Sequence, residues 1–183
     1  MPFNINTFIQ NMDRDGLRPN LFDIILPAFN GLPTQEFTLR AKATALPASS
    51  IGVAPLFYFG RQAKFAGNRV FSDWTVTIIM DESDFRPNGS KGQLEAWTGL
   101  INSHIGNIRS GAWVTPGPAG YYRDGLVRQY GKSGDVVARY QMTGCFPIDV
   151  GAIPVDWGAN DQIAEFSVTF AMQWWTSESS VDN

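Results

Sequence analysis

The sequence predicts a mostly β protein, a two-sheet β-sandwich or barrel-like domain with one flanking helix at about 91–105. Residues 162–174 alternate strictly between apolar and polar side chains, and this period of two fits a strand and no helix. The chain has 18 glycines and 11 prolines, which separate short extended segments more naturally than they allow long helices. Several strand-like segments accompany one good helix, and a length of 183 residues favours a single domain over 1–183.

The first part of the chain is expected to hold one short helix and two strands. Residues 1–16 form a short amphipathic segment that caps the core. Residues 18–26 follow as a strand, 27–33 as a turn region and 36–44 as a second alternating strand. Pro47 closes that strand, because proline cannot donate to a ladder. The N-terminal helix is predicted from four apolar residues at helical spacing: Ile5, Phe8, Ile9 and Met12.

The middle of the chain combines an apolar run, a strong strand and the main helix. Residues 51–65 are less regular, and their centre at 56–59 is apolar throughout, so it is either buried on both sides or exposed and adhesive. Alternation returns at 74–80, and an acidic loop at 81–89 leads into the helix. A capping-box spacing and apolar residues at helical intervals mark that helix: Ser90 and Gln93, then Leu94, Trp97, Ile101 and Ile105.

The last part of the chain returns to strands. A glycine-rich connection between two alternating segments predicts a β-hairpin. The expected elements are, in order, a loop at 111–120, strands at 125–130 and 135–143, a proline-broken segment at 145–156, the strand 162–174 and a C-terminal tail at 176–183.

Charge and cysteine content restrict the class of protein. A net charge of −3 and a pI near 5.1 argue against a protein that grips nucleic acid through its phosphates. Cys145 is the single cysteine, so no intrachain disulfide can form, which fits a reducing compartment. No apolar run is long enough for a membrane span, and the N-terminus lacks the pattern of a signal peptide. We therefore expect a protein that works without a membrane and is not secreted by the usual route.

The sequence offers no convincing catalytic, cofactor or metal site. His104, the single histidine, lies on the predicted helix with no serine or cysteine motif beside it, and Cys145 has no basic neighbour that would activate a thiolate. The carboxylates within 81–84 are better explained as a solvated loop before a helix than as a carboxylate pair or metal site. Residues 156–161 lack an oxygen ligand at the third position of a calcium loop, so a turn is expected. The prediction is a protein that is not an enzyme.

Two aromatic features suggest contact surfaces. One is the apolar run, and the other is the adjacent pair Trp174 and Trp175, of which the second faces outward if the first faces the core. Packing at a sheet margin, a protein interface and a sugar-stacking platform are all open for these side chains. The candidate contact residues are Leu56, Phe57, Tyr58, Phe59 and Trp175.

A set of short motifs extends over most of the chain in a characteristic order. They are Arg-Pro-Asn-Leu-Phe at 18–22, Lys-Ala-Thr-Ala-Leu-Pro-Ala at 42–48, Asp-Trp-Thr-Val-Thr at 73–77, Val-Arg-Gln-Tyr at 127–130, and Val-Gly and Asp-Trp within 150–157. Together these motifs resemble the tail tube protein family of contractile-tailed bacteriophages. Departures lie at 27–33, 111–120 and 176–183, so the resemblance says least about contacts made by those loops and by the C-terminus.

The resemblance implies a structural virion protein of the phage tail, assembled in the host cytoplasm, with no catalysis and no cofactor. Family members have a β-sandwich-like domain with a flanking helix, related to the tube protein of type VI secretion. Six copies form a ring in which one sheet of each closes into a barrel, and the rings stack into a tube through which viral DNA passes during ejection. The implied partners are further copies of the chain, the tail sheath protein, baseplate and tail terminator proteins, and a tape measure protein in the lumen.

Two alternatives stay open beside the tube subunit. A tube-initiating or tube-capping baseplate relative shares the fold and most of the motifs. Outside the family, a β-sandwich carbohydrate-binding module would use the exposed aromatic side chains.

Within the tube hypothesis, the run at 56–59 is the candidate for ring stacking. The polar face of the strand 162–174 is the candidate lumen lining, because short non-basic side chains let DNA slide without adhering. The alternative is that this strand lies in an outer sheet and meets a neighbour or the sheath. The candidate lumen-facing residues are Glu165, Ser167, Thr169 and Gln173.

Overall fold

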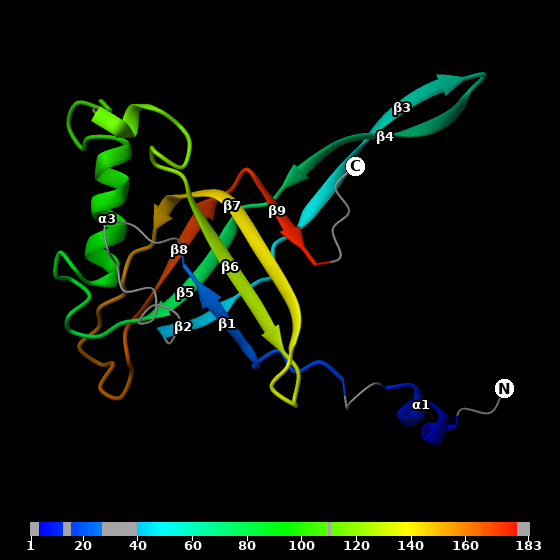
Figure 1. Ribbon diagram of the computed structural model, residues 1–183, viewed down its shortest axis with the longest axis horizontal. Coiled ribbons are helices and arrows are strands. Elements are labelled where there is room, and N and C mark those ends of the chain that lie inside the picture. Colours follow the sequence, from blue (N-terminus) through cyan, green and yellow to red (C-terminus); the bar gives the residue numbers. More distant parts are fainter. Residues whose placement is uncertain (1–3, 13–15, 27–39, 110, 179–183) are drawn as a thin grey trace.

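The structure is a computed structural model that describes residues 4–12, 16–26, 40–109 and 111–178. Its ribbon has a β body with a helix at one end and a long hairpin projecting from the other (Figure 1). The elements are α1 (Ile5–Asn11), β1 (Phe22–Ile25), β2 (Ala41–Thr44), β3 (Ser49–Tyr58), β4 (Arg61–Phe71), β5 (Trp74–Ile79), α3 (Ser90–Ile101), the 3-10 helix η2 (Gly111–Val114), β6 (Arg123–Tyr130), β7 (Val136–Val150), β8 (Glu165–Ala171) and β9 (Trp174–Ser177).

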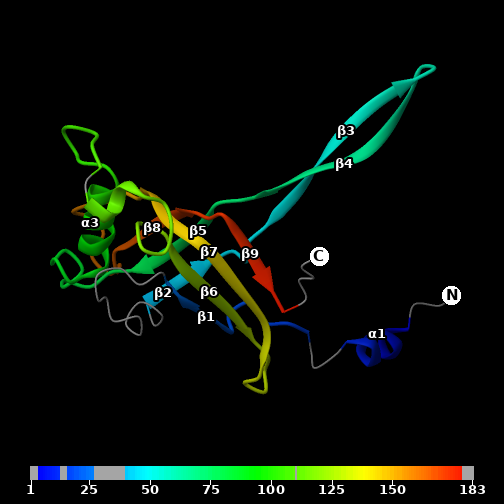
Figure 2. The ribbon, with the colours of Figure 1, turned by 45° about the horizontal axis from the view of Figure 1, so that its top comes forward.

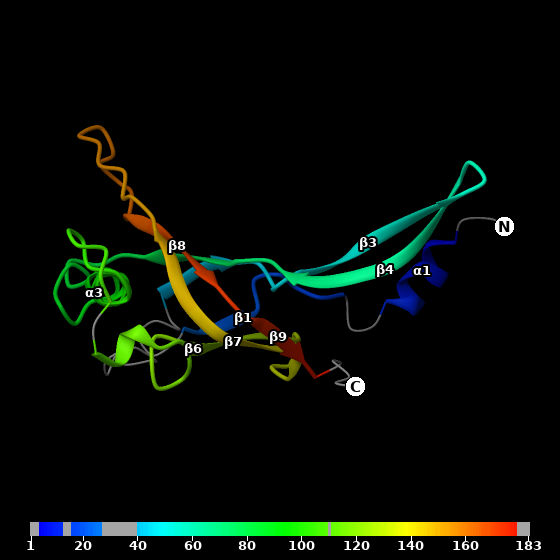
Figure 3. The ribbon, with the colours of Figure 1, turned by 90° about the horizontal axis from the view of Figure 1, so that it is seen from above.

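The larger of the two sheets has seven strands in the order β1-β6-β7-β8-β5-β2, with β9 also on β7. The 15-residue strand β7 joins two wings of this sheet, since its first half pairs with β6 and β9 and its last residues pair with β8. Gly144 lies between these halves with φ of 68°, a left-handed conformation that glycine adopts without strain. Figure 3 shows the resulting curve of β7. The predicted mostly β fold with two sheets is confirmed.

The core lies between the wings and is supplied by alternate residues of the strands. On β5 and β8 the inward side chains are fully or nearly fully buried, as the alternation predicted. Trp74 packs on Phe170 with ring centroids 5.6 Å apart. Each large apolar side chain buried in this way stabilises the fold by about 1.5–3 kcal/mol. The inward residues of these two strands are Trp74, Val76 and Ile78, and Phe166, Val168 and Phe170.

Helix α3 closes one end of the core through a buried tryptophan. The ring of Trp97 lies 6.3 Å from that of Phe170, and its Nε1 donates to the carbonyl of Tyr121. The helix begins at Ser90, one residue earlier than the predicted capping box requires, because its N-cap is Gly89 and not Ser90. It also ends at residue 101, so the predicted extension to 105 is wrong, and Ile105 is fully exposed in a turn beyond it.

The second sheet is the β3–β4 hairpin, which stands away from the body (Figure 2). Its strands have 10 and 11 residues, and almost every residue of both is exposed. Phe59 and Gly60 form the two-residue turn, with φ of 45° and 75°. The apolar run is therefore exposed in the isolated chain rather than buried on both sides.

Several predicted boundaries need correction. The first helix forms, but α1 buries none of its side chains, so it does not cap the core. Pro147 does not interrupt β7, which runs on to Val150 with a register shift beside the proline. The strand predicted at 162–174 starts only at residue 165 and breaks at 172–173.

One further prediction is confirmed, and others cannot be compared with the structure. The hairpin predicted from the glycine-rich connection is confirmed as β6 and β7. The turn at 27–33, the first part of the strand at 36–44 and the end of the tail at 176–183 lie outside the described residues.

Candidate assembly surfaces

The β3–β4 hairpin is the largest exposed apolar feature among the described strands. Its exposed large apolar residues include Phe57 at 70% and Phe59 at 88%. Its charged residues are all basic and all on β4. Contiguous apolar surface of this kind marks a contact site in a soluble protein. The exposed apolar residues are Ile51, Val53, Leu56, Phe57, Tyr58, Phe59, Phe65 and Val70, and the basic ones are Arg61, Lys64 and Arg69.

The turn at the hairpin tip holds an aromatic residue in an unfavourable backbone conformation. Two-residue hairpin turns with two positive φ angles prefer asparagine followed by glycine, whereas here Phe59 precedes Gly60. A bulky residue at positive φ costs about 1–3 kcal/mol. The Phe59 ring packs edge-on against Tyr58, with centroids 4.5 Å apart. The tip of the hairpin therefore presents two aromatic rings, one from the end of β3 and one from the turn.

The base of the hairpin is held by Trp175 of β9. Its indole Nε1 donates to the carbonyl of Ala48 at 3.2 Å, and its ring packs edge-on against Phe71 and Tyr140. The predicted orientation of the tryptophan pair is wrong: Trp174 is 49% exposed and Trp175 packs against the core. The break before β9 resets the alternation, which reverses the two faces. A direct inter-subunit role for Trp175 stays a prediction.

The polar face of β8 carries three of the four candidate lumen residues. Glu165, Ser167 and Thr169 are half-buried on the face opposite the core. Gln173 does not join them, because it is exposed in the break between β8 and β9. Lys42 Nζ lies 2.5 Å from Glu165 Oε2. The hydroxyls of Thr75 and Thr169 are 3.2 Å apart, so this face is polar without a cluster of positive charge.

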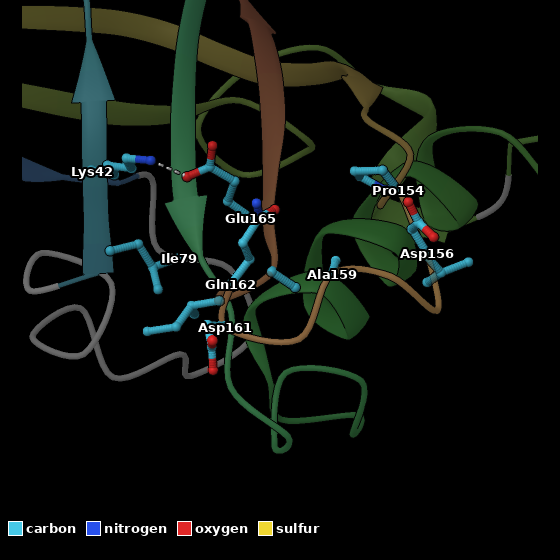
Figure 4. Close-up of a pocket in the computed structure, with 11 residues that line it drawn as sticks. Lys42, Ile79, Pro154, Asp156, Ala159, Asp161, Gln162 and Glu165 are labelled. Atoms are coloured by element: carbon cyan, nitrogen blue, oxygen red, sulfur yellow. Dashed lines mark hydrogen bonds and ion pairs between the residues drawn. The ribbon is translucent and has the colours of Figure 1, made fainter.

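An open groove lies between the loop before β8 and the strands β2 and β5 (Figure 4). The loop is built on the turn predicted at 156–161, in which the N–H of Ala159 donates to the carbonyl of Asp156. Trp157, within that turn, is fully exposed. The groove is lined by Lys42, Ile79, Pro154, Val155, Asp156, Ala159, Asp161, Gln162, Ile163, Ala164 and Glu165.

A buried carboxylate organises the loop before α3. Asp84 is fully buried, which corrects the expectation of a solvated loop. Its Oδ1 accepts hydrogen bonds from Arg40 Nη1 at 2.9 Å and from the N–H and hydroxyl of Ser90, while its Oδ2 accepts from the N–H of Asp81. Asp84 thereby caps the helix N-terminus in place of the predicted capping box. Hydrogen bonds from Ser83 hold the pKa of Asp81 below its usual value.

The single cysteine and the single histidine lie in different surroundings, one buried and one exposed. Cys145 is buried, and loss of solvation raises the pKa of its thiol to about 12. His104 is exposed just beyond the end of α3. Within the described ranges, no group of three or more His, Cys, Asp or Glu side chains is placed to hold a metal ion. No helix in the described part of the chain is long and apolar enough to cross a membrane.

Comparisons with known proteins identify the family. The family described as "Phage tail tube protein" matches residues 2–178. Tail tube protein gp19 of Enterobacteria phage T4 is 33% identical over 162 residues, which cover 88% of this chain and 91% of that protein. The chain belongs to the phage tail tube protein family, as its motifs predicted. It is a structural protein of the contractile phage tail in the virion and not an enzyme.

Solved structures share the fold at much lower identity. The tube terminating cap of the anti-feeding prophage has a TM-score of 0.62 at 11% identity, over 90% of this chain and 91% of that one. A chain of the PVC sheath-tube complex, from an extracellular contractile injection system in its extended state, has a TM-score of 0.55 at 12% identity, over 97% of this chain and 99% of that one. At such identities the likeness concerns the fold alone.

Proposed function

We propose that this protein is the repeating subunit of the tail tube, in which six copies form a ring and stacked rings enclose a channel for viral DNA. The observation that carries the proposal is the β3–β4 hairpin, which exposes many large apolar side chains and almost all of its residues in the single chain. A two-stranded hairpin is marginally stable in water, so burial against other copies would stabilise it. Family membership supports a tube role for that burial.

The edge strands of the larger sheet are the candidate contacts between neighbouring copies in a ring. Among the described strands, β1 and β2 end the strand order. Unpaired edges attract other strands, and closure across six copies would satisfy them. Such a head-to-tail interface makes a ring when its rotation closes.

The polar face of β8 is the proposed lumen wall. Glu165 is neutralised by Lys42, and the remaining side chains are short hydroxyls, so phosphates would find no cluster of cations there. Gln173 would line the channel only if the segment between β8 and β9 reaches it. DNA, and a tape measure protein before ejection, would pass without specific binding. The sheath, baseplate and terminator proteins would meet the outside and ends of the tube, a placement in keeping with the solved PVC sheath-tube complex, which contains a chain of this fold.

Electron microscopy of the purified protein tests the proposal. Six-fold rings or hollow filaments are expected. Introduction of a negative charge into the apolar run, by Phe57→Glu, should prevent stacking while circular dichroism stays unchanged, because Phe57 is exposed. A protein that stays monomeric at every concentration and is retained on a glycan column would refute the tube subunit. Copy number per virion separates the repeating subunit from an initiating or capping relative.

A further inference from the structure

We propose that the groove between the loop at 154–163 and the strands β2 and β5 receives the β3–β4 hairpin tip of a second copy of this chain. The inference rests on the proposed stacking of rings and names its acceptor surface. Its first support is position: the hairpin tip and the groove loop lie at opposite ends of the molecule (Figures 1 and 3). One chain therefore cannot fill its own groove with its own hairpin, and a head-to-tail contact leaves both ends open for the next copy.

The second support is matched apolar surface. The groove is lined by Ile79 and by exposed apolar side chains of the loop, of which Val155 and Ile163 are the largest. Trp157 is fully exposed on the same loop. On the other partner, Tyr58 and the strained Phe59 form the hairpin tip. An exposed tryptophan and an apolar groove suit aromatic rings that enter from the side, since such contacts are the usual anchors of protein interfaces.

The third support is charge complementarity. All charged residues of the hairpin strands are basic, and Arg61 and Lys64 are the two nearest the tip. The groove carries Asp156 and Asp161, which form no ion pair with any residue that the structure describes. The other two charged lining residues, Lys42 and Glu165, neutralise one another. A basic aromatic tip would therefore meet a groove that carries both acidic and apolar side chains.

Disulfide trapping between copies tests the contact directly. Gln62→Cys on the hairpin and Ala159→Cys in the groove are combined in one chain, and assembled protein is oxidised and run on a denaturing gel without reductant. The native Cys145 is buried, with its thiol pKa raised to about 12, so it does not interfere. A ladder of covalent multimers is expected. Each single variant, and Gln62→Cys combined with Asn102→Cys at the far end of α3, should give none.

Charge reversal gives an independent measurement. Lys64→Glu and Asp161→Lys should each raise the protein concentration needed for filaments by about tenfold or more, and the two changes in one chain should restore most of the loss. Both residues are exposed, so thermal unfolding should be unchanged. Filaments of normal yield with either single variant, or a ladder only in the Asn102→Cys control, would overturn the groove as acceptor. Absence of filaments from the unaltered protein would instead overturn the proposed stacking itself.

Discussion

Replacement of Asp84 by asparagine tests whether one buried carboxylate holds the α3 end of the domain together. Asparagine keeps the shape but removes the charge that faces Arg40, and its NH₂ group cannot accept from the N–H of Asp81 if its oxygen keeps the bonds to Ser90. Breaking a buried ion pair from one side costs about 3–5 kcal/mol of the free energy of unfolding. With a urea m-value of about 2 kcal/mol/M, the midpoint should fall by about 2 M.

The assay is urea unfolding followed by tryptophan fluorescence, with Asp81→Asn as the matched control. Asp81 also pairs with Arg40, at 2.5 Å, but its side chain is 46% exposed, so its loss should change the midpoint far less. Equal shifts for the two variants, or a shift below about 0.5 M for Asp84→Asn, would show that burial of this carboxylate contributes little.

Three further outcomes follow from particular contacts. Gly92→Ala should destabilise α3 although alanine is the better helix former, because the new Cβ would lie 2.3 Å from the carbonyl oxygen of Arg86. The control is Gly99→Ala in the same helix, whose Cβ would have the side chain of His104 as its nearest neighbour, at 3.3 Å. Measured by thermal unfolding, this control should be neutral or stabilising by up to about 1 kcal/mol. Cys145 should resist iodoacetamide until the chain unfolds. Because the pKa of its thiol is about 12 in the folded protein and 9.0 ordinarily, its contribution to stability should be full below pH 9 and be lost as the pH rises towards 12. Unfolding midpoints of the wild type and of Cys145→Ala, measured across this pH range, test the loss. Trp175→Ala should speed tryptic cleavage in the hairpin and reduce filament yield, while Trp174→Ala, at an exposed position, should leave cleavage unchanged.

Side-chain alternation predicted the central strands well because a period of two fixes both faces of a strand whatever its neighbours are. Val76 on β5 and Val168 on β8 are buried as expected, and the polar residues that alternate with them along each strand face away from the core. The same rule misplaced Trp175, since a sequence can keep alternating across a break in which the backbone changes direction. Periodicity reports faces, whereas strand ends depend on pairing with β7.

The burial of Asp84 could not be predicted from its local sequence. Its main cationic partner, Arg40, is 44 positions away in the chain and reaches it only in the folded domain. The sequence predicted only a solvated acidic loop before the helix and a cap at Ser90, because the choice between a solvated and a buried carboxylate depends on that distant partner. Buried structural side chains of this sort follow from tertiary contacts and not from spacing in the sequence.

The sequence left two interpretations of the apolar run open: burial on both sides, or exposure as an adhesive surface. In the single chain the run is exposed. On the proposed assembly the two readings describe the same residues before and after stacking, because a strand pair without a core of its own becomes buried only when another copy covers it. The strain at Phe59 fits this view. An Asn-Gly turn would be less strained and would fold the hairpin more favourably, but it would lack the Phe59 ring at the tip. Phe59→Asn should therefore stabilise the isolated hairpin and at the same time weaken the stacking of rings.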